Sequence, residues 1–257
     1  MASSWRQTLL FARQALIDPH RGSNLGIAWM YLQPLVMILI YTLVFSRFMS
    51  ARLPGIDSPY AYSLYLVPGL LLWTVFANVV NGMVGVYQGK AHVIRKIPVD
   101  MRLMPLYLPL VEIVNFAVAM AFFVIFCAAI GHPPTLAWLL LVPVCLGTAL
   151  MAYAIGLFLA VLSPFLPDLR PMTAIAVQLG FWLTPILYVP DLLPPWAAAL
   201  LDYHPVYWII QQGQAIVLYG RVGNGTLWAV QTAFSVVLCG LGWVAVRAAE
   251  REVRDLL

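Results

Sequence analysis

The stretch QGKAHVIRKIPVDMRLM, residues 88–104, decides how this chain is oriented, because it is a basic segment between two long apolar runs. Short loops beside membrane spans concentrate Lys and Arg on the cytoplasmic side, so this segment predicts a cytoplasmic loop. Two interpretations remain open from these residues. Either the loop only anchors the topology, or it holds a short helix on which an intracellular partner pushes. Its charged residues are one acid and four bases: Asp100, Lys90, Arg95, Lys96 and Arg102.

Composition puts the chain in the membrane class. Of its 257 residues, 63% are hydrophobic and 9% are charged, whereas about 25% of the residues in a soluble domain are charged. Spans and short connections use this length, which leaves no room for a soluble catalytic domain. The net charge of +4 comes from bases beside apolar segments, where they orient a membrane protein, so we predict no nucleic-acid partner.

The sequence indicates neither a metal site nor a catalytic centre. The cysteines lie inside apolar runs, the histidines are widely separated, and no Cys/His, Ser/His/Asp or paired-carboxylate arrangement is visible. A phosphate-binding loop around Gly89-Lys90 would need glycine at position 84 and Ser or Thr at position 91, where the chain has Val84 and Ala91. We therefore predict a chain that is not an enzyme and binds no cofactor itself.

Hydropathy predicts an all-α polytopic membrane protein with six transmembrane helices, each long enough to cross ~30 Å of hydrocarbon. Residues 3–17 carry apolar side chains on one helical face and Arg6 and Arg13 on another, which predicts an amphipathic helix at the membrane interface. Pro68-Gly69 is expected to break the outer end of the second span. The spans are expected at about residues 27–46, 60–87, 103–130, 136–162, 172–189 and 227–246.

Glu112 is the only acid that we expect inside a span. An intramembrane acid is a candidate functional residue by default. Because Glu112 lies within a few turns of the basic segment, it can equally be a structural acid that is paired or reaches the interface. Both interpretations stay open.

Residues 190–225 do not form an ordinary span, because several prolines and glutamines interrupt their apolar pattern. We predict a re-entrant outer hairpin here, between the fifth and sixth spans. With six spans and both termini cytoplasmic, eleven of the 14 Lys and Arg residues lie inside and the other three outside, a clear positive-inside bias. Asn224-Gly225-Thr226 fits either a glycosylation sequon or a turn.

Several segments resemble the membrane subunits of polysaccharide ABC exporters, the permeases for O-antigen, capsule or teichoic-acid chains. The resemblance covers nearly the whole chain, in order: RGSNLGIAW (21–29), LQPL (32–35), YTLVFS (41–46), PGL (68–70) with Trp73, LPDL (166–169), LTPILY (183–188) and LP (193–194). Two departures bear on the exported polymer more than on the fold. The family often has Arg-Asp where this chain has Pro167-Asp168. It commonly has Asn-Pro, then Glu and Arg, where this chain has His204-Pro205, Gln211 and Gln214.

The resemblance implies that residues 1–257 form one ABC exporter transmembrane domain in the bacterial inner membrane. It implies a homodimer that lines one channel, a lipid-linked polysaccharide as cargo, and two copies of a separate subunit that binds ATP and Mg. It also implies roles for three sets of residues. Residues that couple the chain to the ATPase are Lys90, His92, Arg95, Lys96, Asp100 and Arg102. The cytoplasmic mouth for the substrate is at Arg21, Leu25 and Gly26, where Arg21 attracts a pyrophosphate or acts only as an interfacial anchor.

Aromatic side chains are candidates for the channel lining, because sugar rings pack their C–H faces on aromatic rings; for each, lipid-facing or helix-packing roles are the alternative. This third set of residues is Tyr31, Tyr41, Trp73, Phe76, Phe181, Trp182 and Tyr188. Two other functions are weighed against polysaccharide export. One is an ABC permease for a lipid or a hydrophobic drug. The other is a membrane-embedded lipid-sugar transferase, against which the scarcity of loop carboxylates argues.

Overall fold

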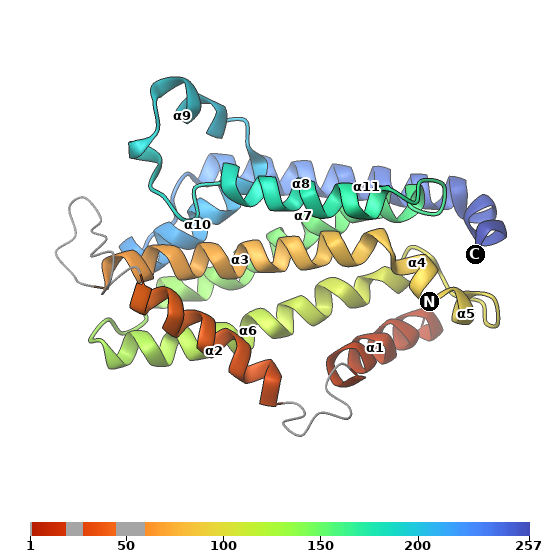
Figure 1. The fold of residues 1–257 in the computed structure, drawn as a ribbon, viewed down its shortest axis with the longest axis horizontal. Helices are drawn as coiled ribbons and strands as arrows, with labels where there is room; N and C mark the ends of the chain where they lie inside the picture. The colour runs from red at the N-terminus through yellow and green to blue at the C-terminus, as the bar shows by residue number, and fades with distance from the viewer. Residues whose placement is uncertain (1, 19–27, 45–59) are drawn as a thin grey trace.

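The computed structural model describes residues 2–18, 28–44 and 60–257, and over these residues its regular structure is entirely helical. Figure 1 shows the long helices running side by side along the longest axis of the molecule. The α-helices are α1 (Ala2–Ile17), α2 (Ala28–Thr42), α3 (Ala61–Val84), α4 (Val86–Gly89), α5 (Ala91–Ile94), α6 (Tyr107–Ala129), α7 (Leu141–Leu162), α8 (Leu169–Leu183), α9 (Pro195–Leu201), α10 (Pro205–Tyr219) and α11 (Gly225–Leu256). Three short 3-10 helices join them: η3 (Met104–Leu106), η4 (Leu136–Leu140) and η5 (Pro190–Leu192).

The all-α membrane fold is confirmed, and four of the expected spans are long and apolar enough to cross a membrane. They are Ala61–Val84, Met104–Ala129, Leu136–Leu162 and Gly225–Leu256. Helices α2 and α8 have 15 residues each. At 1.5 Å per residue, 15 residues cover about 22 Å, which is less than the ~30 Å of a hydrocarbon core.

Helices α3 and α7 form the centre of the bundle, with α10 packed on both and α11 along α7. Small residues allow this close approach. A side-chain carbon added at Gly156 of α7 would lie 2.5 Å from Cγ of Met83 on α3, and one added at Gly213 of α10 would lie 2.4 Å from Cδ1 of Leu72. Close packing of this kind stabilises helix pairs in a membrane, where lipid provides no hydrophobic drive between helices.

Pro68 does not break α3, so the expected break at the outer end of the second span is wrong. The helix is continuous from Ala61 to Val84 with Pro68 inside it. The neighbouring Gly69 lets α10 approach so closely that an added carbon would lie 2.9 Å from Nε2 of Gln214. Packing against α10 therefore holds the helix through the proline, as neighbouring helices commonly do in membranes.

Helix α8 ends at Leu183, before the expected end of the fifth span at residue 189. Thr184 is extended, as the residue before a proline prefers, and Pro185 follows. The non-helical carbonyls that result are satisfied by α3: Tyr65 donates its hydroxyl to the carbonyls of Pro185 (3.0 Å) and Tyr188 (2.9 Å), and Tyr62 donates to Leu187. Buried backbone in a membrane protein needs such internal partners.

The residues expected to form an outer hairpin contain α9 and α10. His204 caps α10, since its Nδ1 accepts from the backbone N–H of Tyr207 at 3.2 Å, and Gly220 ends the helix in the left-handed conformation with φ 63°. Asn224 then caps α11 by accepting from the N–H groups of Thr226 (3.1 Å) and Leu227 (3.2 Å). The Asn224 side chain therefore has a local structural role, which agrees with the turn interpretation.

The bundle has two unlike ends. Figure 1 shows α4, α5, the start of α1 and the C-terminus together at one end, which we call the basic end, and η5 with the turns before η4 and α11 toward the opposite, far end. Helix α11 has 32 residues and is therefore about 48 Å long, so it continues through the charged tail instead of stopping near residue 246.

Candidate functional site

At the basic end, residues 95–103 form a loop that we call the anchored loop. Its carbonyl oxygens accept hydrogen bonds from side chains of four different helices, α1, α4, α7 and α11. The donor and acceptor pairs are Thr8 Oγ1 to Leu103 O (3.0 Å), Tyr87 Oη to Met101 O (2.7 Å), Tyr153 Oη to Arg102 O, and Arg254 Nη2 to Val99 O (2.7 Å). These hydrogen bonds tie one short loop to four helices at once.

The residues predicted to couple to an ATPase divide into two groups. His92, Arg95 and Lys96 are exposed, and within the described residues their side chains make no hydrogen bond or ion pair. With Ile97 and Pro98, which are also exposed, they form a basic and apolar surface that we call the exposed basic surface. Such a surface suits an acidic and apolar cleft on a partner protein.

The other three coupling residues make contacts within the chain. The ammonium of Lys90 lies over the rings of Phe11 (5.2 Å) and Tyr107 (5.8 Å), which ties the segment to α1 and α6. Arg102 and Asp100 form an ion pair at 3.2 Å, and the Arg102 backbone N–H also donates to Asp100 at 2.9 Å. These three side chains therefore hold the loop in place, whereas His92, Arg95 and Lys96 stay exposed.

The Asp100–Arg102 pair is charged at neutral pH. Partial burial of the Asp100 carboxyl opposes its ionisation, but the hydrogen bonds and charge of Arg102 outweigh this effect and lower its pKa. The hydrogen bond to Asp100 raises the pKa of Arg102 in turn. The pair consequently contributes a fixed local geometry without net charge.

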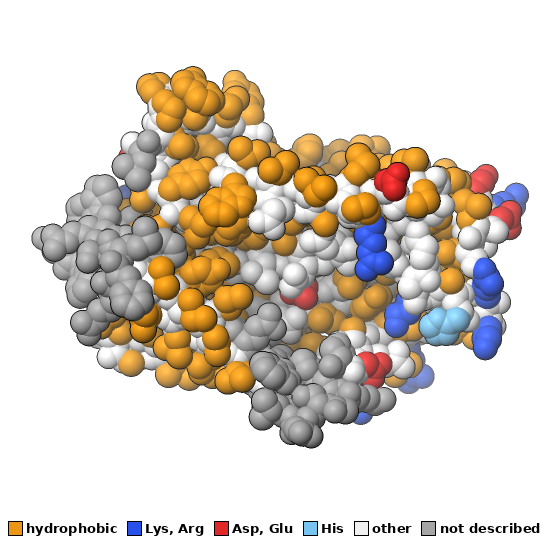
Figure 2. All heavy atoms as spheres, viewed as in Figure 1, with side chains coloured by type: hydrophobic (Ala, Val, Ile, Leu, Met, Phe, Trp, Pro, Cys, Tyr) orange, Lys and Arg blue, Asp and Glu red, His pale blue; other side chains and the backbone are white. Residues whose placement is uncertain are grey.

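A line of polar side chains runs along the membrane-length helix α3 into α4. Thr74, Asn78 and Asn81 follow one another at intervals of four and three residues, so they share one face of α3, and Gln88 follows in α4 after the break at Gly85; all four are exposed. We call these four residues the polar stripe. Figure 2 views this side of the molecule and shows a white band, in which no hydrophobic side chain lies, with an acidic side chain in it and orange apolar surfaces on both sides.

Glu112 of α6 joins the polar stripe. Its carboxylate accepts from Nδ2 of Asn78 at 3.0 Å and from Nδ2 of Asn115 at 3.2 Å. Both partners are neutral amides, so within the described residues Glu112 is not an ion-paired anchor. Exposed amides and a carboxylate are costly against lipid tails, and therefore this face needs water or a second polar surface against it.

The predicted aromatic lining lies mainly inside a helix contact. Trp73 is 6% exposed, and its ring packs on Phe76 (5.4 Å) and Phe181 (5.9 Å), which joins α3 to α8. Trp182 is 58% exposed, Tyr41 is half-buried, and Tyr188 donates its hydroxyl to the Leu183 carbonyl at 3.1 Å. The side chain of Tyr31 lies outside the described part of the chain, as do Arg21, Leu25 and Gly26. A channel role for these aromatics and a mouth at residues 21–26 stay predictions.

Sequence reasoning missed the polar stripe and the side chains that anchor the loop. The stripe had a visible signal, because its four polar residues recur at helical spacing inside an apolar run. The anchoring hydroxyls had none, since Tyr87 and Tyr153 look like ordinary apolar positions. Among the described residues, no group of three His, Cys, Asp or Glu side chains could hold a metal ion.

Comparison with known proteins identifies a family and relatives that the chain resembles. The family described as ABC-2 type transporter matches residues 6–218. An O-antigen export system permease protein RfbA of Klebsiella pneumoniae is 25% identical over 209 residues, which cover 81% of this chain and 76% of that protein. A protein of the same name from Myxococcus xanthus is 25% identical over 221 residues, which cover 85% of this chain and 83% of that protein.

Proposed function

The chain belongs to the ABC-2 type transporter family, and from this premise we propose that it is the permease subunit of an ATP-driven exporter of lipid-linked polysaccharide. Proteins that resemble it over most of their length are named as O-antigen export permeases, so the cargo we propose is a polymer of this kind. The chain works in the bacterial inner membrane as a multi-pass transport subunit. ATP hydrolysis belongs to a separate subunit.

In the proposed architecture, α2 and α8 are the first and fifth of six spans, α9 and α10 enter from the outer side, and both termini are cytoplasmic. The basic end, with the exposed basic surface and the bases of α11, fits the cytoplasmic side. Two copies of the chain form the channel. The exposed apolar residues of α2 and α8, among them Met37, Ile40, Ile175 and Leu179, give the second copy a surface to cover.

The observation that carries the choice of cargo is the polar stripe with Glu112. Between two copies, this face would border a water-filled path, where amide and hydroxyl groups can bind the hydroxyl groups of sugars. Thr74, Asn78 and Gln88 each make one hydrogen bond within the chain. An apolar drug or a lipid tail in the same path would leave their remaining polar atoms, and the amide of Asn81, without water or another polar partner, which costs free energy. The stripe therefore favours a hydrated polymer over the lipid or drug alternative.

The anchored loop supports a role for the basic end in coupling ATP hydrolysis to export. His92, Arg95 and Lys96 would contact the ATPase subunit, and closure of that subunit on ATP would push the loop. Its four hydrogen-bonded anchors would carry the movement into α1, α4, α7 and α11. Helix α1, which exposes Trp5 and Leu9, would lie at the membrane surface beside the same partner.

Purification of the tagged chain from its own cells tests this function. We expect an ATPase subunit to co-purify, and we expect lipid-linked glycans extracted from the same cells to stimulate ATP hydrolysis by the complex but not by the ATPase alone. Stimulation by apolar drugs without stimulation by glycans would favour the alternative transporter. A preparation in which no ATPase accompanies the chain contradicts the proposal.

A further inference from the structure

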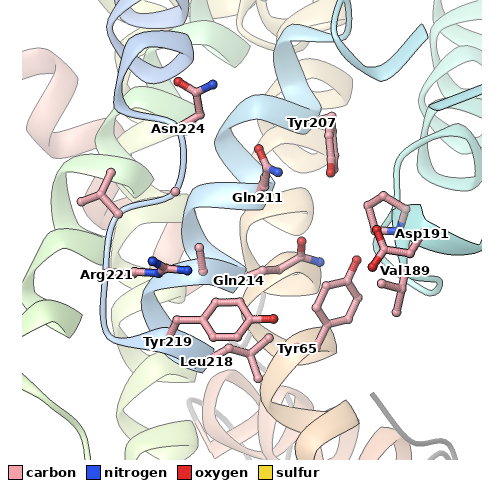
Figure 3. Close-up of a pocket in the computed structure, with 14 residues that line it drawn as sticks. Tyr65, Val189, Asp191, Tyr207, Gln211, Gln214, Leu218, Tyr219, Arg221 and Asn224 are labelled. Carbon is pink, nitrogen blue, oxygen red and sulfur yellow. The ribbon is translucent and has the colours of Figure 1, made fainter. Parts of the chain in front are cut away.

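The far end of the bundle contains a cavity of about 610 Å³ that the transport path just described does not use. Its wall comes from α3, the segment at residues 189–191, α10, and the connection at residues 219–224. This size lies within the ~300–1,000 Å³ of typical small-molecule sites, so it can hold a short piece of a polymer but not a long one. Figure 3 shows side chains from these segments converging on the same space.

Three tyrosines contribute aromatic surface to this cavity: Tyr65, Tyr207 and Tyr219. Tyr65 is fixed, because its hydroxyl donates to the Pro185 and Tyr188 carbonyls. Tyr207 is 6% exposed, and no hydrogen bond of its hydroxyl is found within the described residues. This hydroxyl is not one of the fully buried unpaired atoms, so it is accessible from the cavity and can hydrogen-bond to a molecule or water there.

The two α10 glutamines that line the cavity, Gln211 and Gln214, differ in the same way. Gln214 donates its Nε2 to the Pro185 carbonyl at 3.2 Å, so it belongs to the scaffold, and Figure 3 shows it directed toward Tyr65. Gln211, on the preceding turn of α10, lines the cavity, and within the described residues its amide has no partner. It therefore has two N–H donors and an oxygen acceptor free, a combination that matches adjacent hydroxyl groups.

The charges at the cavity balance. Asp191 and Arg221 both line it and both are exposed, and the Arg221 guanidinium lies over the Tyr219 ring at 5.8 Å. One acid and one base favour neither a strong anion nor a strong cation. An acyl chain would leave the free amide and the Tyr207 hydroxyl unpaired, which is unfavourable. The remaining chemistry, aromatic faces beside free amide groups, suits a neutral, hydroxyl-rich ring.

We propose that this cavity is a sugar-binding site, in which Gln211 and Tyr207 bind hydroxyl groups and Tyr219 packs against a sugar face. The inference rests on the proposed function, since export brings the glycan to the far end last. A short glycan segment bound in this cavity would already lie beyond the membrane-spanning path. Its binding would oppose movement of the polymer back toward the cytoplasm. The site shares no residue with the polar stripe, although α3 contributes to both.

The test uses the permease–ATPase complex in lipid nanodiscs, because sugar-headed detergents would compete. The probe is a lipid-free oligosaccharide released by mild acid from the cells' own surface polysaccharide, and saturation-transfer NMR measures its binding. Gln211→Leu and Tyr219→Leu remove the proposed contacts. Tyr203→Leu is the matched control, since Tyr203 is 82% exposed on the same outer segment and does not line the cavity. Recovery of the ATPase subunit with each variant checks that it folds.

We expect the oligosaccharide to bind the unmodified complex and the control equally, and each cavity variant at least ~10-fold more weakly, a change of about 1.4 kcal/mol. Equal binding to all variants, or no binding to the unmodified complex, overturns the site. Glycan-stimulated ATP hydrolysis, measured on the same preparations, separates the two proposals. If hydrolysis still responds to lipid-linked glycan, only the cavity assignment fails; if that response is absent as well, the export function fails and the cavity assignment with it.

Discussion

The two ends of this bundle use one structural solution for two different purposes. At the basic end, the anchored loop has its carbonyls bound by Thr8, Tyr87, Tyr153 and Arg254. At the far end, the irregular segment after α8 has its carbonyls bound by tyrosines and a glutamine of the neighbouring helices. In both places side chains replace the missing helical hydrogen bonds, as a membrane protein requires.

The difference lies in what each end presents. The anchored loop exposes Arg95 and Lys96, which suit a protein partner. The far end encloses a cavity with free hydrogen-bonding groups and balanced charge, which suits a small hydroxylated ligand. In the proposed account, the same kind of anchoring holds a loop that couples to the ATPase at one end and a scaffold around a ligand site at the other. Variants at the two ends should therefore have different consequences.

The largest effect is expected at the exposed basic surface. The double variant Arg95→Glu, Lys96→Glu reverses two charges at the proposed ATPase contact, and like-charge contacts at an interface cost several kcal/mol. We expect surface polysaccharide, measured by immunoblot, to fall at least ~100-fold, since each 1.4 kcal/mol corresponds to a factor of ten.

Arg247→Glu with Arg251→Glu makes the same charge change on α11, at the same end but outside the exposed basic surface. Both bases are exposed there and neither is hydrogen-bonded within the described residues. This control should retain most of the export. Equal loss in the two double variants would mean that net positive charge, and not this surface, matters.

A smaller effect is expected in the polar stripe, which runs from the middle of α3 toward the basic end. Asn81→Leu removes an exposed amide from the proposed path, and one lost hydrogen bond is worth about 0.5–1.5 kcal/mol, or about 2–12-fold in export. Export per ATP hydrolysed is the measurement. Thr232→Leu, on the exposed face of α11, is the control, because the Thr232 hydroxyl bonds only to Trp228 and Gln231 of the same helix. A lower export per ATP in both variants would show that export needs polar groups on exposed helix faces in general, and not the polar stripe in particular.

Removing the anchoring hydroxyls should have a third, moderate effect, and its consequence for ATP use should differ between the basic end and the far end. Tyr153→Phe and Tyr65→Phe each leave buried carbonyls unsatisfied, so each should lower stability by about 1–3 kcal/mol in thermal unfolding. Only Tyr153→Phe should also raise the ATP consumed per glycan exported, because only Arg102 and its neighbours belong to the anchored loop. If Tyr65→Phe uncouples hydrolysis to the same extent, the functional division between the ends is incorrect.

The smallest effect is expected at Asp100. Its contact with Arg102 is partly exposed, so Asp100→Asn should change stability by only about 0.2–1 kcal/mol. Because folding lowers the Asp100 pKa, this stabilisation is fully present above the unfolded value of about 3.9 and is lost as pH falls through the lower folded value. Unfolding midpoints of the two proteins should thus differ equally at pH 6 and pH 8 and converge in strong acid. A difference that disappears between pH 8 and pH 6 would assign the effect to another group.

How much the sequence could predict follows from the kind of interaction that decides each feature. Hydropathy located four long spans and the basic segment, because hydrophobic burial and loop charge depend on composition over many residues. It failed at Pro68, where local propensity favoured a break but packing against Gln214 holds α3 straight through. The end of α8 at Leu183 was readable from Pro185, yet the apolar run continues past it and concealed the boundary.

The sites were less predictable, because they combine residues that are distant in the chain. The exposed trio His92, Arg95 and Lys96 was named from the sequence, but nothing there distinguished it from Lys90, which the rings of Phe11 and Tyr107 cover. Gln211 and Gln214 stood out as departures from the related family. Only the fold shows that one supports the backbone and the other faces a cavity.

The most direct test of the account is which side of the membrane each end faces. With Cys127, Cys145 and Cys239 changed to Ala, a single cysteine is introduced by Lys96→Cys at the basic end or by Tyr203→Cys near the far end, and intact cells are treated with a membrane-impermeant maleimide. The account predicts that Tyr203→Cys is labelled in intact cells and Lys96→Cys only after the cells are broken. Labelling of Lys96→Cys in intact cells would contradict both the orientation and the contact with a cytoplasmic ATPase.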